Sequence, residues 1–193
     1  MGDPLNHPET YDVGRMRERF EILSHEERAS GFLWAPCRKT AGELLQLGKR
    51  VVYADSAKSV EGFEIILRRQ ALHRGFMLRC KGRTFVPTRV EEVERRFLRV
   101  EAGAVALVPC TAERPFPLGG RCFHAIRSEK YRRHEEAEPY SLNDLAEVLT
   151  VPRTVELQRG ALVLVAGVPY EIQVVHDFDE HLCSYEILRR EDL

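Results

Sequence analysis

An internal repeat constrains this chain more than any other feature of its sequence. Gly75, Gly82 and Phe85 align without a gap with Gly160, Gly167 and Tyr170, an offset of 85 positions. The same offset pairs Glu101 with Glu186, Cys37 with Cys122, and the strand-like segments 20–23 and 105–108. A constant offset over most of 193 residues indicates two tandem copies of one unit. We predict an N-terminal arm at 1–16, a first unit at 17–103 and a second at 104–193.

The residues of each unit favour β-strands. Segments 51–53, 63–67 and 161–165 are rich in β-branched and aromatic residues. Lys81-Gly82 and Ala166-Gly167 place a residue that tolerates positive φ between two strands, so each predicts a hairpin. A strand over 168–175 and a closing strand over 182–188 follow the second hairpin. We therefore predict a mainly β protein made of two small antiparallel barrels or sandwiches.

Helical and loop signals are few. Thr40–Leu47 and Ser141–Leu149 predict two short helices, with Thr40 and Ser141 as N-caps. Segment 111–120 has the strongest loop composition, and 127–138 is so charged that we expect a solvated loop or arm. The unit boundary is expected near Gly103, with almost no linker, so the two units should pack against each other.

Composition limits the function classes. Lys and Arg total 29 against 30 Asp and Glu, which argues against a protein whose main task is to bind a phosphate backbone. The five cysteines are scattered singly and no signal peptide is evident, so we expect free, buried thiols in the cytoplasm. No apolar run approaches the length that spans a bilayer, so no membrane association is expected.

No catalytic motif is present in the sequence: we find no Walker loop, GxGxxG, GxSxG or HExxH. The densest set of potential ligands is His176, Asp177, Asp179, Glu180 and His181, residue types that can build a metal or acid–base site. We interpret this stretch as a polar turn between the last two strands. We expect no enzyme activity, no metal and no cofactor.

The basic residues and the only tryptophan offer interaction candidates. Arginine doublets occur at 68–69, 95–96, 132–133 and 189–190, each with acidic neighbours and without interleaved aromatic residues. Solvated strand faces explain the doublets, and salt bridges between subunits are the alternative. Trp34 is expected to be a core or interface anchor.

Four motifs follow one another in the first unit: a strand at Arg19–Leu23, Trp34-Ala35, the segment Ala41–Leu45, and the strand 63–69. This order resembles the head–tail adaptor (head-closure) proteins of tailed bacteriophages, in which a W-A-x-V strand and a G-x-E segment follow the first strand. Gly82–Val86 and Gly167–Ile172 both look like the "G-x-x-Y-x-I" hairpin of that family. The resemblance covers about 17–101 and, mainly in its latter half, the second unit. Family members usually have one unit, and Pro87 interrupts the return strand, which predicts an edge or a bulge there.

The resemblance implies a small β-barrel and a structural virion protein of the phage neck. It implies a homo-oligomeric ring between portal and tail, assembled in the host cytoplasm, that helps to retain packaged DNA, docks the tail and lets double-stranded DNA pass. Portal or adaptor proteins and tail-completion proteins are the expected partners, and a near-neutral ring would not hold the DNA back. Ring contacts would join different patches of neighbouring subunits. Candidate contact residues are Trp34, Arg68, Arg69, Phe116, Arg132 and Arg133, and candidate contact loops are 24–31, 54–60 and 115–121.

Three alternatives stay open. A tail or baseplate adaptor of the same virion class differs only in its position in the particle. A nucleic-acid-binding barrel of the OB type predicts salt-dependent binding to single strands. An enzyme built around 176–181 predicts a bound metal.

Overall fold

The fold is mainly β, as the sequence predicts. The computed structural model describes residues 13–51, 60–113, 119–131, 145–177 and 180–190. A single 3-10 turn, η1 (Val13–Arg15), precedes the strands of the first half. These are β1 (Glu18–Arg28), β2 (Gly31–Val51), β3 (Val60–Arg68), β4 (Met77–Cys80), β5 (Arg83–Val93) and β6 (Phe97–Val105). The second half contains β7 (Leu107–Ala112), β8 (Cys122–Tyr131), β9 (Leu145–Pro152), β10 (Leu162–Val165), β11 (Val168–Asp177) and β12 (Leu182–Arg189).

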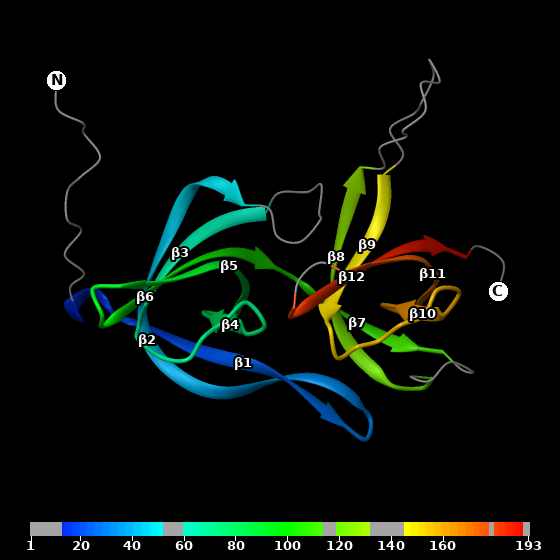
Figure 1. Ribbon diagram of the computed structural model, residues 1–193, viewed down its shortest axis with the longest axis horizontal. Helices are drawn as coiled ribbons and strands as arrows, with labels where there is room; N and C mark the ends of the chain where they lie inside the picture. The colour runs from blue at the N-terminus through cyan, green and yellow to red at the C-terminus, as the bar shows by residue number, and fades with distance from the viewer. Residues whose placement is uncertain (1–12, 52–59, 114–118, 132–144, 178–179, 191–193) are drawn as a thin grey trace, which may run out of the picture.

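The two halves pair their strands in the same cyclic order. In the first half β1 pairs with β2, and the pairing continues through β3, β6, β5 and β4 back to β1. In the second half β7 pairs with β8, and the pairing continues through β9, β12, β11 and β10 back to β7. All of these pairs are antiparallel. A single parallel bridge between Gly31 and Cys122 joins the halves, which lie side by side in Figure 1.

The 85-position offset holds for the last four strands of each half. β3, β4, β5 and β6 begin at 60, 77, 83 and 97, and their counterparts begin at 145, 162, 168 and 182. The offset is wrong for the first two strands. Arg79 pairs with Glu21 and Glu21 with Lys39, whereas Leu164 pairs with Thr111 and Thr111 with Cys122. Lys39, not Cys37, is therefore the counterpart of Cys122, because the β1–β2 hairpin is longer than the β7–β8 hairpin.

Both predicted tight hairpins are confirmed. Lys81 and Gly82 have φ values of 51° and 75°, and Ala166 and Gly167 have φ values of 49° and 83°. Two successive positive φ values match the twist of the flanking antiparallel strands. The predicted irregularity at Pro87 is also present, because the β5–β6 register shifts between Pro87 and Arg89.

Both predicted helices are wrong. Residues 40–47 belong to β2, and 145–149 belong to β9, while 141–144 lie outside the described residues. Helix propensity is a weak preference that pairing overrides. Gly42 shows why β2 is extended: it pairs with both Glu18 and Leu67. A Cβ there would lie 2.6 Å from Leu67 Cδ2, so neighbouring strands enclose this backbone on both sides.

Several predicted loops are strands. Residues 24–28 continue β1 and Gly31 begins β2, so only Ala29 and Ser30 form the turn of that hairpin. Residues 111–112 belong to β7, and 127–131 belong to β8. Gly103 lies inside β6, and only Ala106 separates β6 from β7. The remainder of the predicted arm at 132–138, the loop residues 54–59 and residues 114–118 lie outside the described residues.

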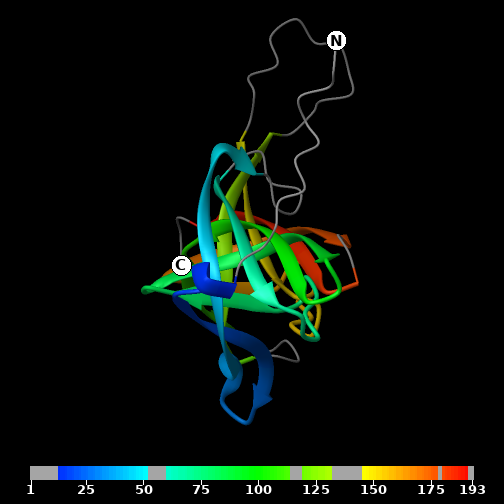
Figure 2. The same ribbon diagram turned by 90° about the vertical axis from the view of Figure 1, so that its left-hand side faces the viewer.

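Within the described segments, buried apolar side chains form three clusters. One lies inside the first half, around Phe20, Ile65 and Phe85. A small cluster of Leu23, Met77, Val86 and Ile126 lies where the outer faces of the halves meet. The third fills the second half, and all of its residues come from that half except Phe32, which is 2% exposed. Phe32 lies on the β1–β2 hairpin, which runs from the first half beneath the second half in Figure 1 and projects at the bottom of Figure 2.

Phe32 takes the position in the second core that Phe76 takes in the first core. In the first half, Phe76 packs against the core and the Arg38 guanidinium lies 5.5 Å above its ring. The counterpart of Phe76 in the second half is Ala161, which is buried. Arg121, the counterpart of Arg38, instead lies 4.4 Å above the ring of Phe32. The first half therefore completes the core of the second half.

Candidate functional site

Trp34, a predicted contact residue, lies at the junction between the halves. It packs partly buried against the cluster that contains Leu23 and Ile126. The His25 ring lies edge-on to the Trp34 ring, with centroids 5.1 Å apart. The structure therefore places Trp34 within the chain, where the two halves pack against each other.

The other predicted contact residues divide into two sets. Arg68 and Arg69 are exposed at the end of β3, and Arg69 forms a 2.9 Å ion pair with Glu92. Phe116, Arg132 and Arg133 lie outside the described residues. The exposed doublet at the end of β3 is thus the part of the predicted contact set that is displayed to solvent.

The predicted polar turn at 176–181 is partly strand. His176 belongs to β11 and its Nε2 lies 2.8 Å from Glu186 Oε1, while Glu180 and His181 form the bend before β12. Residues 178–179 lie outside the described residues. Among the residues that the structure describes, no group of three or more histidine, cysteine or acidic side chains is arranged to hold a metal.

The prediction that the cysteine thiols are buried is correct for three of the five cysteines. Cys80, Cys110 and Cys183 are buried, and burial raises the pKa of Cys110 to about 12. Cys37 and Cys122 are exposed, so the prediction of buried thiols is wrong there. Cys37 lies on β2 and Cys122 on β8, the second strand of each half, where the ungapped repeat alignment does not hold.

Polar contacts reinforce the junction at the hairpin tip. Arg121 donates hydrogen bonds to Glu27 Oε1 at 2.9 Å and to the carbonyl of Arg28 at 2.8 Å. Thr154 Oγ1 lies 2.8 Å from His25 Nδ1, and the His25 ring stacks on Phe32. Burial lowers the pKa of His25 to about 4, so this imidazole is neutral at pH 7.

A second histidine contact joins the halves elsewhere. The imidazoles of His73 and His181 stack with centroids 4.2 Å apart, beside a cavity of about 620 Å³. A Cβ on Gly75 would lie 2.8 Å from the His73 ring, so a larger residue there would require the ring to shift. Burial and the neighbouring His181 lower the pKa of His73. The two histidine contacts and the apolar cluster together fix how the halves sit on each other.

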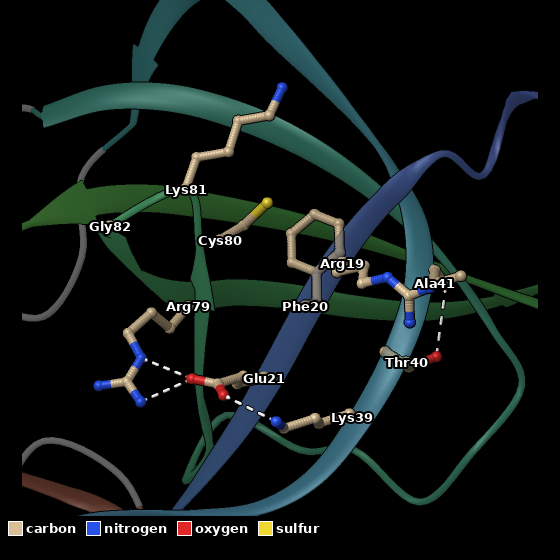
Figure 3. Close-up of a pocket in the computed structure, with 10 residues that line it drawn as sticks. All are labelled: Arg19, Phe20, Glu21, Lys39, Thr40, Ala41, Arg79, Cys80, Lys81 and Gly82. Carbon is tan, nitrogen blue, oxygen red and sulfur yellow. Dashed lines mark hydrogen bonds and ion pairs between the residues drawn. The ribbon is translucent and has the colours of Figure 1, made fainter.

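A pocket of about 490 Å³ opens in the wall of the first half (Figure 3). The β1–β4 pairing runs only from Leu23 to Glu21 on β1, and the pocket lies just beyond its end. The pocket is lined by Arg19, Phe20, Glu21, Lys39, Thr40, Ala41, Arg79, Cys80, Lys81 and Gly82. The core residues Phe20 and Cys80 are buried behind it, so the wall opens onto the edge of the core.

Four cationic side chains surround this opening, which we call the seam pocket. Glu21 accepts hydrogen bonds from Arg79 Nε at 2.8 Å and Nη2 at 2.6 Å, and Lys39 Nζ lies 3.6 Å from its other oxygen. The bond from Arg79 lowers the pKa of Glu21. Lys81 Nζ donates to Glu18 Oε1 at 2.6 Å, which raises the pKa of Lys81. The four cationic side chains around the pocket are therefore balanced by only two carboxylates, those of Glu18 and Glu21.

The sequence reasoning missed the seam pocket. Its cations lie at positions 19, 39, 79 and 81, on three strands and the β4–β5 turn, and no local spacing connects them. Only the β1–β2 and β1–β4 registers bring them together. A usable signal was the difference between the repeats, because Arg79 and Lys81 align with the uncharged Leu164 and Ala166.

Comparison with known proteins adds no assignment. No protein-family model, no curated protein and no solved structure matches this chain. In the described part of the chain, no helix has the length and apolar character needed to cross a bilayer. A functional proposal therefore has to be based on the fold, the repeat and the surface.

Proposed function

We propose that this chain is a structural protein of the phage neck, a head–tail connector of the head-closure type in a two-unit form. Subunits assemble into a ring between portal and tail, where the ring helps to retain packaged DNA and docks the tail. The proposal rests on the resemblance of the sequence motifs, and it places the protein in the virion after assembly in the host cytoplasm. Its partners are further copies of itself, a portal or adaptor protein, and tail-completion proteins.

One observation supports this proposal most directly. The hairpin that resembles the family pattern occurs twice, and both copies join the fourth and fifth strands of a half with the same cyclic strand order. Phe85 and Tyr170, the aromatic residues of that pattern, are both buried, at 0% and 3% exposed. The motif therefore falls at equivalent core positions in both halves, as a duplicated domain requires.

The test is assembly. Light scattering of the purified protein, alone and mixed with the portal and tail-completion proteins of its own genome, should show a discrete ring or a larger complex. Electron microscopy of that complex would show whether the ring sits at the portal. A protein that stays monomeric and ignores those partners at tens of micromolar would contradict the proposal.

Charge reversal tests the predicted contact surface. If the exposed doublet at the end of β3 contacts a neighbouring subunit, Arg68→Glu with Arg69→Glu should reduce the ring fraction. A matched control is Arg159→Glu with Arg189→Glu, two exposed arginines of the second half. Equal assembly by both double variants would remove Arg68 and Arg69 from the proposed contact set.

A further inference from the structure

The two halves provide an internal comparison for the seam pocket. The strand registers make Thr111 the counterpart of Glu21, Cys122 that of Lys39, and Leu164 that of Arg79. Pro109 and Ala166 are the counterparts of Arg19 and Lys81. None of these five residues of the second half is charged. The same strand arrangement therefore forms in this chain without the charges, so the fold does not require them.

The backbone differs at the same place. In the second half, Ala166 donates a 2.8 Å hydrogen bond from its N–H to the carbonyl of Pro109, which closes the wall beyond the last β7–β10 pair. The equivalent bond in the first half would run from the N–H of Lys81 to the carbonyl of Arg19. Although both residues are described, that bond is not formed, and the seam pocket opens there.

The charges around the opening are unevenly paired. Among the described residues, Arg19 has no ion-pair partner, and Arg79 and Lys39 share the single carboxylate of Glu21. Figure 3 shows the Arg19, Lys39, Arg79 and Lys81 side chains distributed around Phe20 and Cys80. The volume of about 490 Å³ lies in the range of small binding sites, which combine an apolar floor with a few placed polar groups.

We propose that the seam pocket is a docking site for a carboxylate-bearing segment of a partner protein. A carboxylate matches the two surplus cations and can accept a hydrogen bond from a guanidinium and from the free N–H of Lys81. A nucleic-acid strand fits less well, because Glu18 and Glu21 would face its phosphates and the wall presents no exposed aromatic stacking surface. This proposal does not depend on the neck function.

Binding of a short acidic probe tests the site. The full-length protein should bind fluorescein-labelled hexaglutamate in an anisotropy titration, and the affinity should fall as salt rises. Arg19→Gln with Lys81→Asn should weaken binding about tenfold, because it removes two of the four cations. Asparagine suits position 81 because it tolerates the positive φ of 51°. The control, Arg50→Gln with Arg159→Gln, removes two exposed arginines elsewhere and should stay within twofold.

Zero-length carbodiimide cross-linking supplies a readout of position. The probe carboxylates should couple to Lys39 or Lys81, with Lys49 as the internal reference lysine outside the pocket. Equal loss of affinity in the pocket variant and the control, or cross-links no more frequent at Lys39 and Lys81 than at Lys49, would overturn the proposal. So would duplex DNA that binds through Arg19 and Lys81 while the peptide does not.

Discussion

Phe32 offers the sharpest test of how the two halves depend on each other. Its side chain is 2% exposed and completes a core that otherwise consists of residues of the second half. Replacing it with alanine removes on the order of 100 Å² of buried apolar surface, or about 2.5 kcal/mol. The remaining cavity adds about 1–2 kcal/mol, and loss of the Arg121 cation–π contact about 0.5 kcal/mol more. Phe32→Ala should therefore lower the free energy of unfolding by about 4–5 kcal/mol.

A second substitution tests the reason for this loss. If Ala161 leaves the space that Phe32 fills, Ala161→Phe should overpack the core of the wild-type protein and destabilise it by about 1–3 kcal/mol. In the Phe32→Ala background the same change should be stabilising, because the new ring enters the empty space as Phe76 does in the first half. The sign of the effect of Ala161→Phe should thus reverse between the two backgrounds.

Urea unfolding is the assay, followed by circular dichroism and by the fluorescence of the only tryptophan, Trp34, which lies beside the hairpin tip. Leu45→Ala is the matched control: Leu45 is also an apolar residue of β2, but it is 42% exposed, so its loss should cost under about 1 kcal/mol. A loss below about 1 kcal/mol for Phe32→Ala, or no reversal for Ala161→Phe, would refute this account of the second core.

Three further predictions concern the junction and the thiols. Gly31→Ala should destabilise the protein by at least about 2 kcal/mol, since Gly31 has a φ of 143° and its Cβ would lie 1.9 Å from the Cys122 carbonyl oxygen. Gly48→Ala, whose Cβ meets open space, should be close to neutral in the same urea titration. His25 has a folded pKa of about 4 against an unfolded value near 6.5, so the unfolded chain binds the extra proton between these values. The free energy of unfolding should therefore fall as the pH drops from 6.5 to 4, by at most about 3 kcal/mol. His25→Gln should flatten that pH dependence, and an unchanged slope would contradict the prediction. In the native protein Cys122 should react with a disulfide reagent in minutes, whereas Cys110 should be protected, as mass mapping of the modified peptides can show.

The local features that the sequence predicted correctly share one physical basis. The hairpins at Lys81-Gly82 and Ala166-Gly167 follow from the φ values that their two-residue turns require, which is a property of the residues themselves. The 85-position offset located four strands of each half, because the corresponding turns and strands keep their lengths. The predicted helix over 40–47 failed because its conformation is set by β1 and β3, which lie far away in the sequence.

The β class of the fold, the two tight hairpins and the repetition of the last four strands follow from the amino-acid sequence, because turn chemistry and strand-forming composition act over short distances. Which half completes which core, and where surface charges meet, depends on how the strands pair and the halves pack. Phe32 and Ala161 are 129 positions apart, and Arg19 and Lys81 are 62 positions apart. No local pattern connects residues so distant, and only strand pairing and the packing of the halves place them together.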